Sequence, residues 1–471
     1  MFCFVQRSGF KKLIYVLKNK IRQGSRLEVM DRILIISYFY APINNARAFR
    51  WSAIAEHWVR KGHHVDVISV WMPALHREEI LNGVHVYRVG GTITEGLRSQ
   101  LKKSVNLSSS TKSRSYSLTE LTGSATSIIK TLVKVIHDHT WKKVFWPDYA
   151  CLWYFPALKK AKQLLEKHHY ESLISVSVPF TGHLVGLGIK KNLPEIPWLV
   201  DIGDPFCFIE YLPTNNHHFY KNLNYATENK IFRKAESVSV TTKATLEKYR
   251  SLFPESATKI SIIPQLMSLD MKPTIKGEVF PKDGKIRLVF AGRLYSEIRK
   301  PDFILRLFKH LLNTHLSDRL ELHFFGNIND CQGYFEPYKI LIDKKIFCHG
   351  IANRDRVLQA MQEADVLVNI ANESPYELPS KVVEYVSLGK PVLNLSKIDN
   401  DSSTEFFKVY PGTLCLLENG TTSDLEHIVK LVEFIEHPPR IEALKLPDLL
   451  APYQIEEIAR AYELLLKKES Q

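Results

Sequence analysis

The chain has 471 residues, of which 45% are hydrophobic and 24% are charged; this composition is typical of folded globular proteins and excludes a disordered chain. A chain of this length rarely folds around a single hydrophobic core, so we expect two domains. No apolar run approaches the ~20 residues that span a bilayer, and the N-terminus lacks the apolar region and cleavage site of a signal peptide. The six scattered cysteines are typical of reduced thiols in a cytoplasmic protein.

The net charge of +13 is concentrated in two segments. Residues 1–30 carry seven Lys or Arg against one Glu, and residues 92–143 carry nine against three acidic residues, so each contributes +6. Over 10–22, apolar residues alternate with basic ones at near-helical spacing, which is typical of a helix on an anionic membrane surface. A solvated helix packed on its own domain fits equally well. Interleaved aromatic residues are missing, so we expect no nucleic-acid partner.

From residue 31 onward, predicted strands and helices alternate. The apolar run over 32–38 is typical of a central parallel strand, and a helix follows at about 47–60. Further strands are predicted at 64–70, 172–177, 198–201, 237–241 and 259–263. The alternation predicts an N-terminal Rossmann-like domain over 31–272, which includes a basic loop at 96–140.

A polar stretch at 271–284 separates a second unit and serves as a candidate hinge. Within this unit, at 285–440, strands are predicted at 285–291, 320–325, 345–348, 366–370 and 392–395. The fold class is therefore α/β, with two doubly wound domains facing across a cleft where the carboxyl ends of both sheets meet. The helical segment at 441–471 ends the chain, and its helix at 455–467 could cover either domain.

The segment from Glu377 to Pro391 carries the most specific signal. Ser380 is a candidate N-cap and Gly389 a candidate C-terminal left-handed residue of a short helix. Lys381 in the first turn opposes the helix dipole, unless an anion such as phosphate binds there. Glu384, one turn later, can accept two hydrogen bonds from a ribose. A plain Lys381–Glu384 pair on a solvated helix face is the alternative.

Residues 31 to about 465 resemble the GT-B glycosyltransferases, in particular glycosyltransferase family 4 (group 1). The resemblance rests on the 379–391 segment, on the sequence AGRLY at 291–295, and on the stretches FGN at 325–327, HG at 349–350 and ADVL at 364–367. It implies retaining transfer of a sugar from a UDP- or GDP-sugar, without a metal ion or cofactor. It also implies an acceptor, which we expect to be a lipid-linked saccharide of surface polysaccharide biosynthesis, used at the inner face of the membrane.

The resemblance also implies the donor residues. Arg293, next to Gly292, and a second cation at Arg299 or Lys300 would stabilise the diphosphate leaving group. The backbone near Gly350 and Ile351 would frame the base, and Ser380, Lys381 and Glu384 would hold diphosphate and ribose. The first glutamate of the family pattern falls at Tyr376, one residue before Glu377. Either Glu377 reaches the donor sugar, or Tyr376 replaces it, or activity is impaired.

On the acceptor side, the resemblance implies that Asp204 orients or deprotonates an acceptor hydroxyl. Arg50, Pro179, His183 and Asp201 would lie on the same side, although a lone helical histidine such as His183 is more often a core residue. The DxD spacing at 399–401 fits a polar turn better than a metal site.

Two other classes of protein fit the same pattern. One is a GT-B protein that binds nucleotide without transferring sugar, which the displaced glutamate suggests. The other is a sugar-nucleotide epimerase, which would need no acceptor.

Overall fold

The computed structural model describes residues 31–91, 145–209, 211, 213–267, 277–439, 441 and 446–467. The basic segment 1–30, the basic loop 96–140 and residues 271–276 of the expected hinge lie outside these residues. The membrane role and the hinge therefore stay predictions.

The N-terminal domain is built on a sheet whose described strands number eight. They are β1 (Arg32–Ser37), β2 (His64–Val70), β3 (Glu78–Leu81), β4 (Val84–Val89), β5 (Ser172–Val176), β6 (Trp198–Asp201), β7 (Ser237–Val240) and β8 (Ile260–Ile262). Their order is β3-β4-β2-β1-β5-β6-β7-β8, and only β3 is antiparallel to its neighbour. The register of β1 on β2 runs from Arg32 opposite His64 to Ile36 opposite Ile68. The strand order changes direction between β1 and β5.

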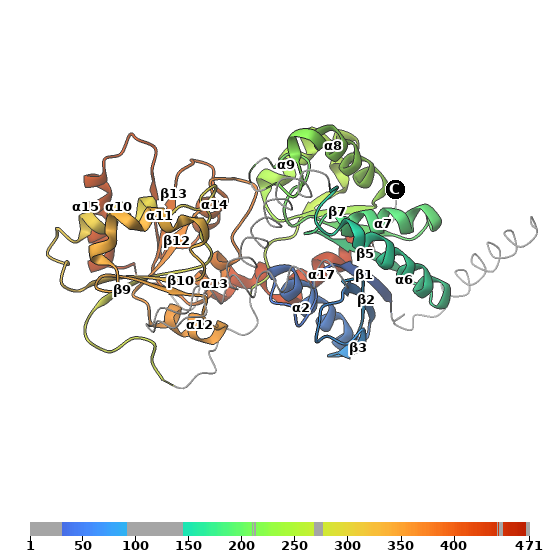
Figure 1. Ribbon diagram of the computed structural model, residues 1–471, viewed down its shortest axis with the longest axis horizontal. Coiled ribbons are helices and arrows are strands. Elements are labelled where there is room, and N and C mark those ends of the chain that lie inside the picture. Colours follow the sequence, from blue (N-terminus) through green and yellow to red (C-terminus); the bar gives the residue numbers. More distant parts are fainter. Residues whose placement is uncertain are drawn as a thin grey trace, which may run out of the picture.

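Helices cover both faces of this sheet because its strands are apolar on both sides. One face packs against α6 (Tyr154–Lys167), α7 (Thr181–Asn192), α8 (His217–Lys234) and α9 (Lys243–Leu252). The other face packs against α2 (Ala46–Arg60) and the last helix, α17 (Ile455–Leu466). The chain thus returns to its first domain at the end, and α17 lies beside α2 in Figure 1.

The C-terminal domain has a parallel sheet of six described strands. They are β9 (Ile286–Ala291), β10 (Leu320–Phe325), β11 (Ile346–Gly350), β12 (Val366–Ile370), β13 (Val392–Ser396) and β14 (Thr413–Leu417). Their order, β11-β10-β9-β12-β13-β14, is the order of dinucleotide-binding sheets, which reverses direction between the first and fourth strands. That switch point lies between β9 and β12.

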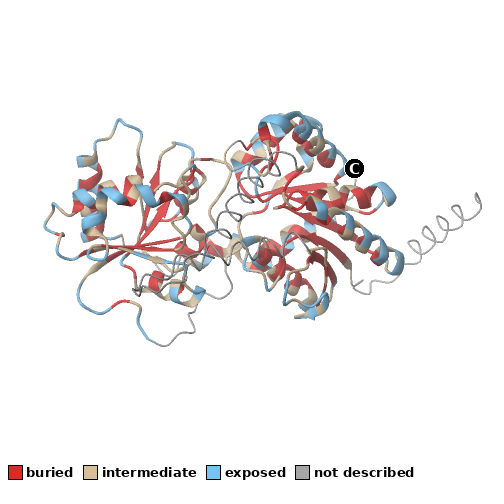
Figure 2. Cartoon of the chain, in the orientation of Figure 1, coloured by how far each residue is buried: buried red, intermediate tan, exposed pale blue. Residues whose placement is uncertain are grey.

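Two helical layers enclose this second sheet. The helices on one face are α10 (Asp302–Leu311), α11 (Gln332–Phe335) and α15 (Asp424–Glu436). The helices on the other are α12 (Arg354–Glu363), α13 (Lys381–Ser387), α14 (Ser402–Phe407) and α16 (Leu446–Leu450). The two domains lie side by side, and the buried residues follow the strands of each sheet (Figure 2). The predicted pair of doubly wound α/β domains is confirmed.

No helix in the described part of the chain is both long enough and apolar enough to cross a membrane.

Candidate functional site

A pocket of about 280 Å³ lies between the two domains, at the carboxyl ends of both sheets. The N-terminal domain contributes the residues that follow β5 and β6, and the C-terminal domain contributes residues that follow β9 and β12. This is where ligands bind in doubly wound folds. The pocket is lined by Ser177, Val178, Phe180, Asp204, Pro205, Phe206, Ile209, Tyr211, Pro213, Thr214, Tyr295, Ile298, Arg299, Asn372 and Glu377.

Arg299 is the cation of the C-terminal wall. Its Nε and Nη2 donate to Oδ1 of Asn372 at 3.0 and 2.7 Å, and its Nη1 donates to the carbonyl of Arg293 at 3.2 Å. These partners are neutral oxygens. Burial lowers the pKa of Arg299, partly offset by Tyr295, Tyr385 and Glu377, yet an Arg guanidinium stays charged at neutral pH. The site therefore presents a cation that is held in place without a close carboxylate among its described hydrogen-bond partners.

Gly292 and Gly326 set the path of the loop that carries Arg293. Gly326 has φ +126°, and a Cβ there would lie 1.9 Å from the carbonyl oxygen of Gly292. Only glycine allows this approach. The Arg293 side chain itself is exposed and donates to the Tyr295 hydroxyl at 3.3 Å. Arg293 is outside the residues that line the pocket, whereas its neighbour Tyr295 is one of them.

Lys300 faces away from this pocket. Its Nζ donates to both carboxylate oxygens of Glu373, at 3.0 and 3.2 Å, and it lines a separate small hollow with Phe303 and Lys397. Of the two candidate cations that the spacing left open, Arg299 lies in the cleft. The expectation of a catalytic Lys300 is corrected, because an ion pair directs its ammonium elsewhere.

Lys381 and Glu384 form the ion pair that was the alternative to nucleotide binding. The ammonium of Lys381 donates to Oε2 of Glu384, and Nη2 of Arg354 lies 3.9 Å from Oε1. Glu384 is buried. A ribose or a diphosphate would have to compete with these partners.

The ends of α13 match one expectation and correct another. Gly389 has φ +61°, and its N–H donates to the carbonyl of Val386 at 3.0 Å, so the predicted left-handed residue is confirmed. Ser380 occupies the N-cap position, but it has helical dihedral angles and its side chain makes no cap hydrogen bond, so the expected side-chain cap is not formed. In contrast, Asp401 caps α14 through Ser403 and Thr404, as a polar turn would.

The expected base-binding segment is open to solvent. Gly350 has φ +68°, a Cβ there would meet nothing within 4 Å, and Ile351 is 74% exposed. The carbonyl of Gly350 accepts from the N–H of Gly326 at 2.8 Å. This contact ties the segment to the glycine loop below Arg293.

Asp204 is the acid of the N-terminal wall, on the loop that follows β6. The preceding residue, Gly203, leaves room for Arg47, since a Cβ on Gly203 would lie 1.5 Å from the guanidinium. The N–H of Gly203 donates to the Ser177 hydroxyl at 2.9 Å. Asp204 itself remains accessible to solvent within the pocket. Its position is therefore set by the close packing of its loop.

Asp204 and Glu377 interact across the cleft. Burial and the nearby Asp204 charge raise the pKa of Glu377, although Tyr211 and Arg299 partly offset the shift. Although Asp204 keeps part of its surface accessible, the walls of the cleft partly desolvate it and raise its pKa, and Arg47 opposes this shift. Like charges at one site favour a shared proton. Both carboxyls, Asp204 of the N-terminal domain and Glu377 of the C-terminal domain, thus bind a proton more tightly than they would in water.

Asp201 and Arg50, two of the expected acceptor residues, are core residues. Asp201 is 1% exposed and accepts from Trp51 Nε1 at 2.9 Å and from the Tyr462 hydroxyl at 2.7 Å. Arg50 is 4% exposed and donates to the Pro264 carbonyl at 2.7 Å. Both expectations of acceptor contact are corrected, because these side chains hold α17 against the sheet.

His183 is also a core residue. It is fully buried, its Nδ1 lies 2.8 Å from the Ser175 hydroxyl, and burial lowers its pKa to about 3. It therefore stays neutral and away from the acceptor. Pro179 is buried too, between Val178 and Phe180, which both line the pocket.

Several residues of the site were not predicted. Asn372 follows β12 directly, and its place after a buried strand was an available signal. Tyr211 carried no such signal, since it lies in an irregular loop; its hydroxyl bonds to the Ser374 hydroxyl and donates to Oε1 of Glu377 at 3.2 Å. The Tyr376 carbonyl accepts from the Thr245 hydroxyl at 2.9 Å. The segment before α13 is therefore held by the other domain.

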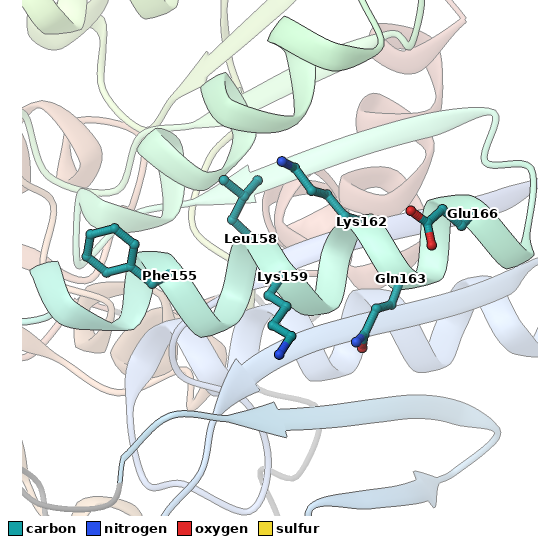
Figure 3. A pocket seen from close by; sticks show the side chains of 6 residues that line it. All are labelled: Phe155, Leu158, Lys159, Lys162, Gln163 and Glu166. Atoms are coloured by element: carbon teal, nitrogen blue, oxygen red, sulfur yellow. The ribbon is translucent and has the colours of Figure 1, made fainter.

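Another surface hollow lies on α6, the helix that precedes β5. Figure 3 shows that one helix supplies its side chains: Phe155, Leu158, Lys159, Lys162, Gln163 and Glu166. Within the described residues, every side chain that lines this hollow comes from α6, so it lacks the convergent polar groups of a ligand site. In the described part of the chain, no group of three or more His, Cys, Asp or Glu side chains is arranged to hold a metal ion.

Two Rossmann-like domains that face each other across a cleft, with the last helix returning to the first domain, define the GT-B fold. Solved structures share it. A glycosyltransferase from Rickettsia africae ESF-5 matches with a TM-score of 0.57 and 13% identity, over 94% of this chain and 100% of its own. Alr3699/HepE from Anabaena, in complex with UDP and glucose, matches with a TM-score of 0.55 and 11% identity, over 93% and 100%.

The catalytic domain of starch synthase IV from Arabidopsis thaliana, bound to ADP and acarbose, matches with a TM-score of 0.56 and 9% identity, over 93% of this chain and 99% of its own. Such low identities show the fold alone. No protein-family model and no curated protein matches the chain. Membership of family 4 stays a prediction.

Proposed function

We propose that this protein is a glycosyltransferase that takes a sugar from a UDP- or GDP-sugar. The observation that carries the proposal is Arg299, a guanidinium bonded to neutral oxygens at the switch point of the C-terminal sheet. Such a cation is matched to a diphosphate, which accepts bidentate hydrogen bonds. HepE, which shares the fold, was solved with UDP and glucose.

The proposed reaction uses groups from both walls of the cleft. As the bond from the anomeric carbon to the diphosphate oxygen breaks, Arg299 stabilises the charge on the leaving group. Arg293, on the same loop, adds to this stabilisation. Glu377 contacts the donor sugar. Asp204 accepts the proton of the acceptor hydroxyl as the new glycosidic bond forms. We propose retention of configuration and no requirement for a metal ion.

The acceptor is the less constrained part of the proposal. The N-terminal wall combines Asp204 with apolar side chains, among them Val178, Phe180 and Ile209. An acceptor with a hydroxyl next to apolar groups fits this wall. We propose a lipid-linked saccharide, reached from the cytoplasmic face of a membrane, as in surface polysaccharide assembly.

The test is a panel of UDP- and GDP-sugars, each assayed for release of the nucleoside diphosphate with and without lipid-linked saccharide acceptors. We expect release that depends on one donor and increases with an acceptor. Unchanged donors throughout the panel would contradict transferase activity.

A second candidate is nucleotide binding without transfer. The displaced glutamate favours it, because the family pattern puts its first glutamate at position 376, where this chain has Tyr376. In that case UDP or GDP would raise the melting temperature, while no donor would be consumed.

A further inference from the structure

Glu228 is a fully buried carboxylate behind the acceptor wall of the cleft. It lies on α8 with none of its surface exposed. Its Oε2 accepts from the backbone N–H of Cys207 at 2.9 Å, and its Oε1 accepts from the Tyr249 hydroxyl at 2.6 Å. Both partners belong to elements that reach the cleft or support it.

These hydrogen bonds end on the loop that carries Asp204. Cys207 lies three residues after Asp204. The Tyr249 hydroxyl also accepts from the N–H of Phe206 at 3.4 Å. The Phe206 ring stacks on Phe180 with centroids 3.8 Å apart, and both rings line the pocket. Two consecutive peptide groups next to Asp204 are thus fixed by Glu228 and Tyr249.

Among the residues that the structure describes, the partners given for Glu228 are hydrogen-bond donors and include no cation. Burial raises its pKa to about 7, although hydrogen bonds from Cys207, Tyr249 and the Phe206 backbone partly offset the shift. The titratable groups that face it are the Cys207 thiol and the Tyr249 hydroxyl, and Lys248 acts on Cys207. A buried carboxylate without a cation destabilises a fold. Such groups concentrate at functional sites.

We propose that Glu228 is a positioning residue that holds the loop with Asp204 in place for the transfer reaction. This inference rests on the proposed function. Glu228 acts through the backbone of Phe206 and Cys207, and it contacts no substrate.

The ionisation of Glu228 then controls how firmly the loop is held. An ionised carboxylate accepts from all the surrounding donors. A protonated carboxyl must donate one hydrogen bond, which the Tyr249 oxygen or, more weakly, the Cys207 sulfur can accept but the peptide N–H groups cannot. As the pH falls through about 7, we expect the loop to loosen and turnover to fall.

The test compares Glu228→Gln with Asp66→Asn as a matched control. Asp66 is also a buried acid of the N-terminal domain, and it also accepts from a tyrosine, Tyr170, at 2.6 Å. Its hydrogen bonds do not reach the Asp204 loop. For Glu228→Gln we expect kcat to fall by about 10–100-fold, the size of a misplaced catalytic group. The KM for the donor should stay unchanged, since the nucleotide binds to the other domain. Asp66→Asn should keep its kcat.

Two further readouts separate positioning from mere packing. The fall in wild-type kcat near pH 7 should disappear in Glu228→Gln. In addition, a raised pKa in the folded state means that Glu228 stabilises the fold at low pH and loses this contribution as the pH rises through about 7. Above that pH, Glu228→Gln removes an uncompensated charge, so its melting temperature should equal or exceed that of the wild type.

Three results would overturn the inference. They are an unchanged kcat in Glu228→Gln, a pH profile that keeps its limb near pH 7, and parallel losses of melting temperature and kcat. If the wild-type protein transfers no sugar from any donor, the proposed function fails and this role falls with it. If the wild type transfers sugar and only the variant result is negative, the role alone is rejected.

Discussion

Arg299 and Lys300 are adjacent in the chain, yet they point into different surroundings. Arg299 lines the cleft pocket and bonds to Asn372, whereas Lys300 pairs with Glu373 outside it. An antiparallel backbone bridge joins Tyr295 and Arg299, and both residues line the cleft pocket. Spacing along the chain does not reveal which of two adjacent side chains faces the cleft.

This difference gives the first prediction. Arg299→Ala should lower kcat/KM for the donor by about 10²–10³-fold, because it removes a fixed charge that stabilises the leaving group. Lys300→Ala, the matched control, should change kcat/KM only slightly. The assay is the initial rate of nucleoside diphosphate release, with circular dichroism to confirm folding. A large loss for Lys300→Ala together with a small one for Arg299→Ala would contradict the assignment.

Sequence reasoning reached part of the site at this scale. It expected Glu377 and Asp204 at the cleft, where both lie, and it left Arg299 and Lys300 as alternatives for the second cation, of which Arg299 lines the pocket. It left Lys381 and Glu384 undecided, because three-residue spacing on a helix is compatible with an ion pair or with a shared ligand. Arg50 and Asp201 were misplaced, since their burial depends on a helix from the far end of the chain.

That helix, α17, is fixed on the N-terminal domain by a network of buried polar side chains. Tyr462 on α17 accepts from Nη2 of Arg50 at 3.0 Å and donates to Asp201 at 2.7 Å. Its ring also packs on Trp51 with centroids 4.9 Å apart. Arg47 and Arg50 hold the pKa of Asp201 below its ordinary value, against the opposing effect of burial. A buried polar network therefore fixes the last helix on the first domain.

Tyr462→Phe tests this network. Removing the hydroxyl leaves Arg50 and Asp201 each without one hydrogen bond in a buried setting, so we expect the free energy of unfolding to fall by about 1–3 kcal/mol. Urea unfolding measures the change. The control is Tyr225→Phe, which removes an exposed hydroxyl that donates to Leu252, and it should change stability by less. Equal effects of both substitutions would show that the network adds nothing.

At the scale of elements, continuous apolar runs predicted the central strands of both sheets. The β3–β4 hairpin and β14 were not predicted. β3 is a short, partly exposed edge strand without an apolar run. β14 does have an apolar sequence, TLCLL, but a run this short does not by itself distinguish a strand from a buried helix segment. The destination of α17 could not be predicted, since its amphipathic pattern reveals a buried face but not its partner.

The two domains contact each other at the segment before α13. Besides Tyr211 and Thr245, Gln265 donates to the Leu378 carbonyl at 3.4 Å. The Phe208 and Tyr376 rings pack edge to face with centroids 5.0 Å apart. The N-terminal domain therefore holds the segment of the C-terminal domain that carries Glu377.

The contact between the two domains at this segment should weaken or strengthen with pH. The pKa of Glu377 is raised in the closed cleft, so its contribution to closure is fully present below the ordinary glutamate pKa and is lost as the pH rises through the raised value. Above it, Glu377 and Asp204 both carry a negative charge and repel each other. We expect the distance between fluorophores on the two domains to increase with pH.

Glu377→Gln should remove most of this pH dependence. The control is Glu373→Gln, which alters a carboxylate of the same segment that pairs with Lys300 outside the cleft, and its pH dependence should match the wild type. An identical opening in Glu377→Gln and in the wild type would place the titrating group elsewhere.

The most direct measurement for the whole account is a crystal structure with bound UDP or GDP. We expect diphosphate oxygens within hydrogen-bond distance of the Arg299 guanidinium, between the ends of β9 and β12. A nucleotide bound elsewhere, with Arg299 still directed only at Asn372 and the Arg293 carbonyl, would contradict the account.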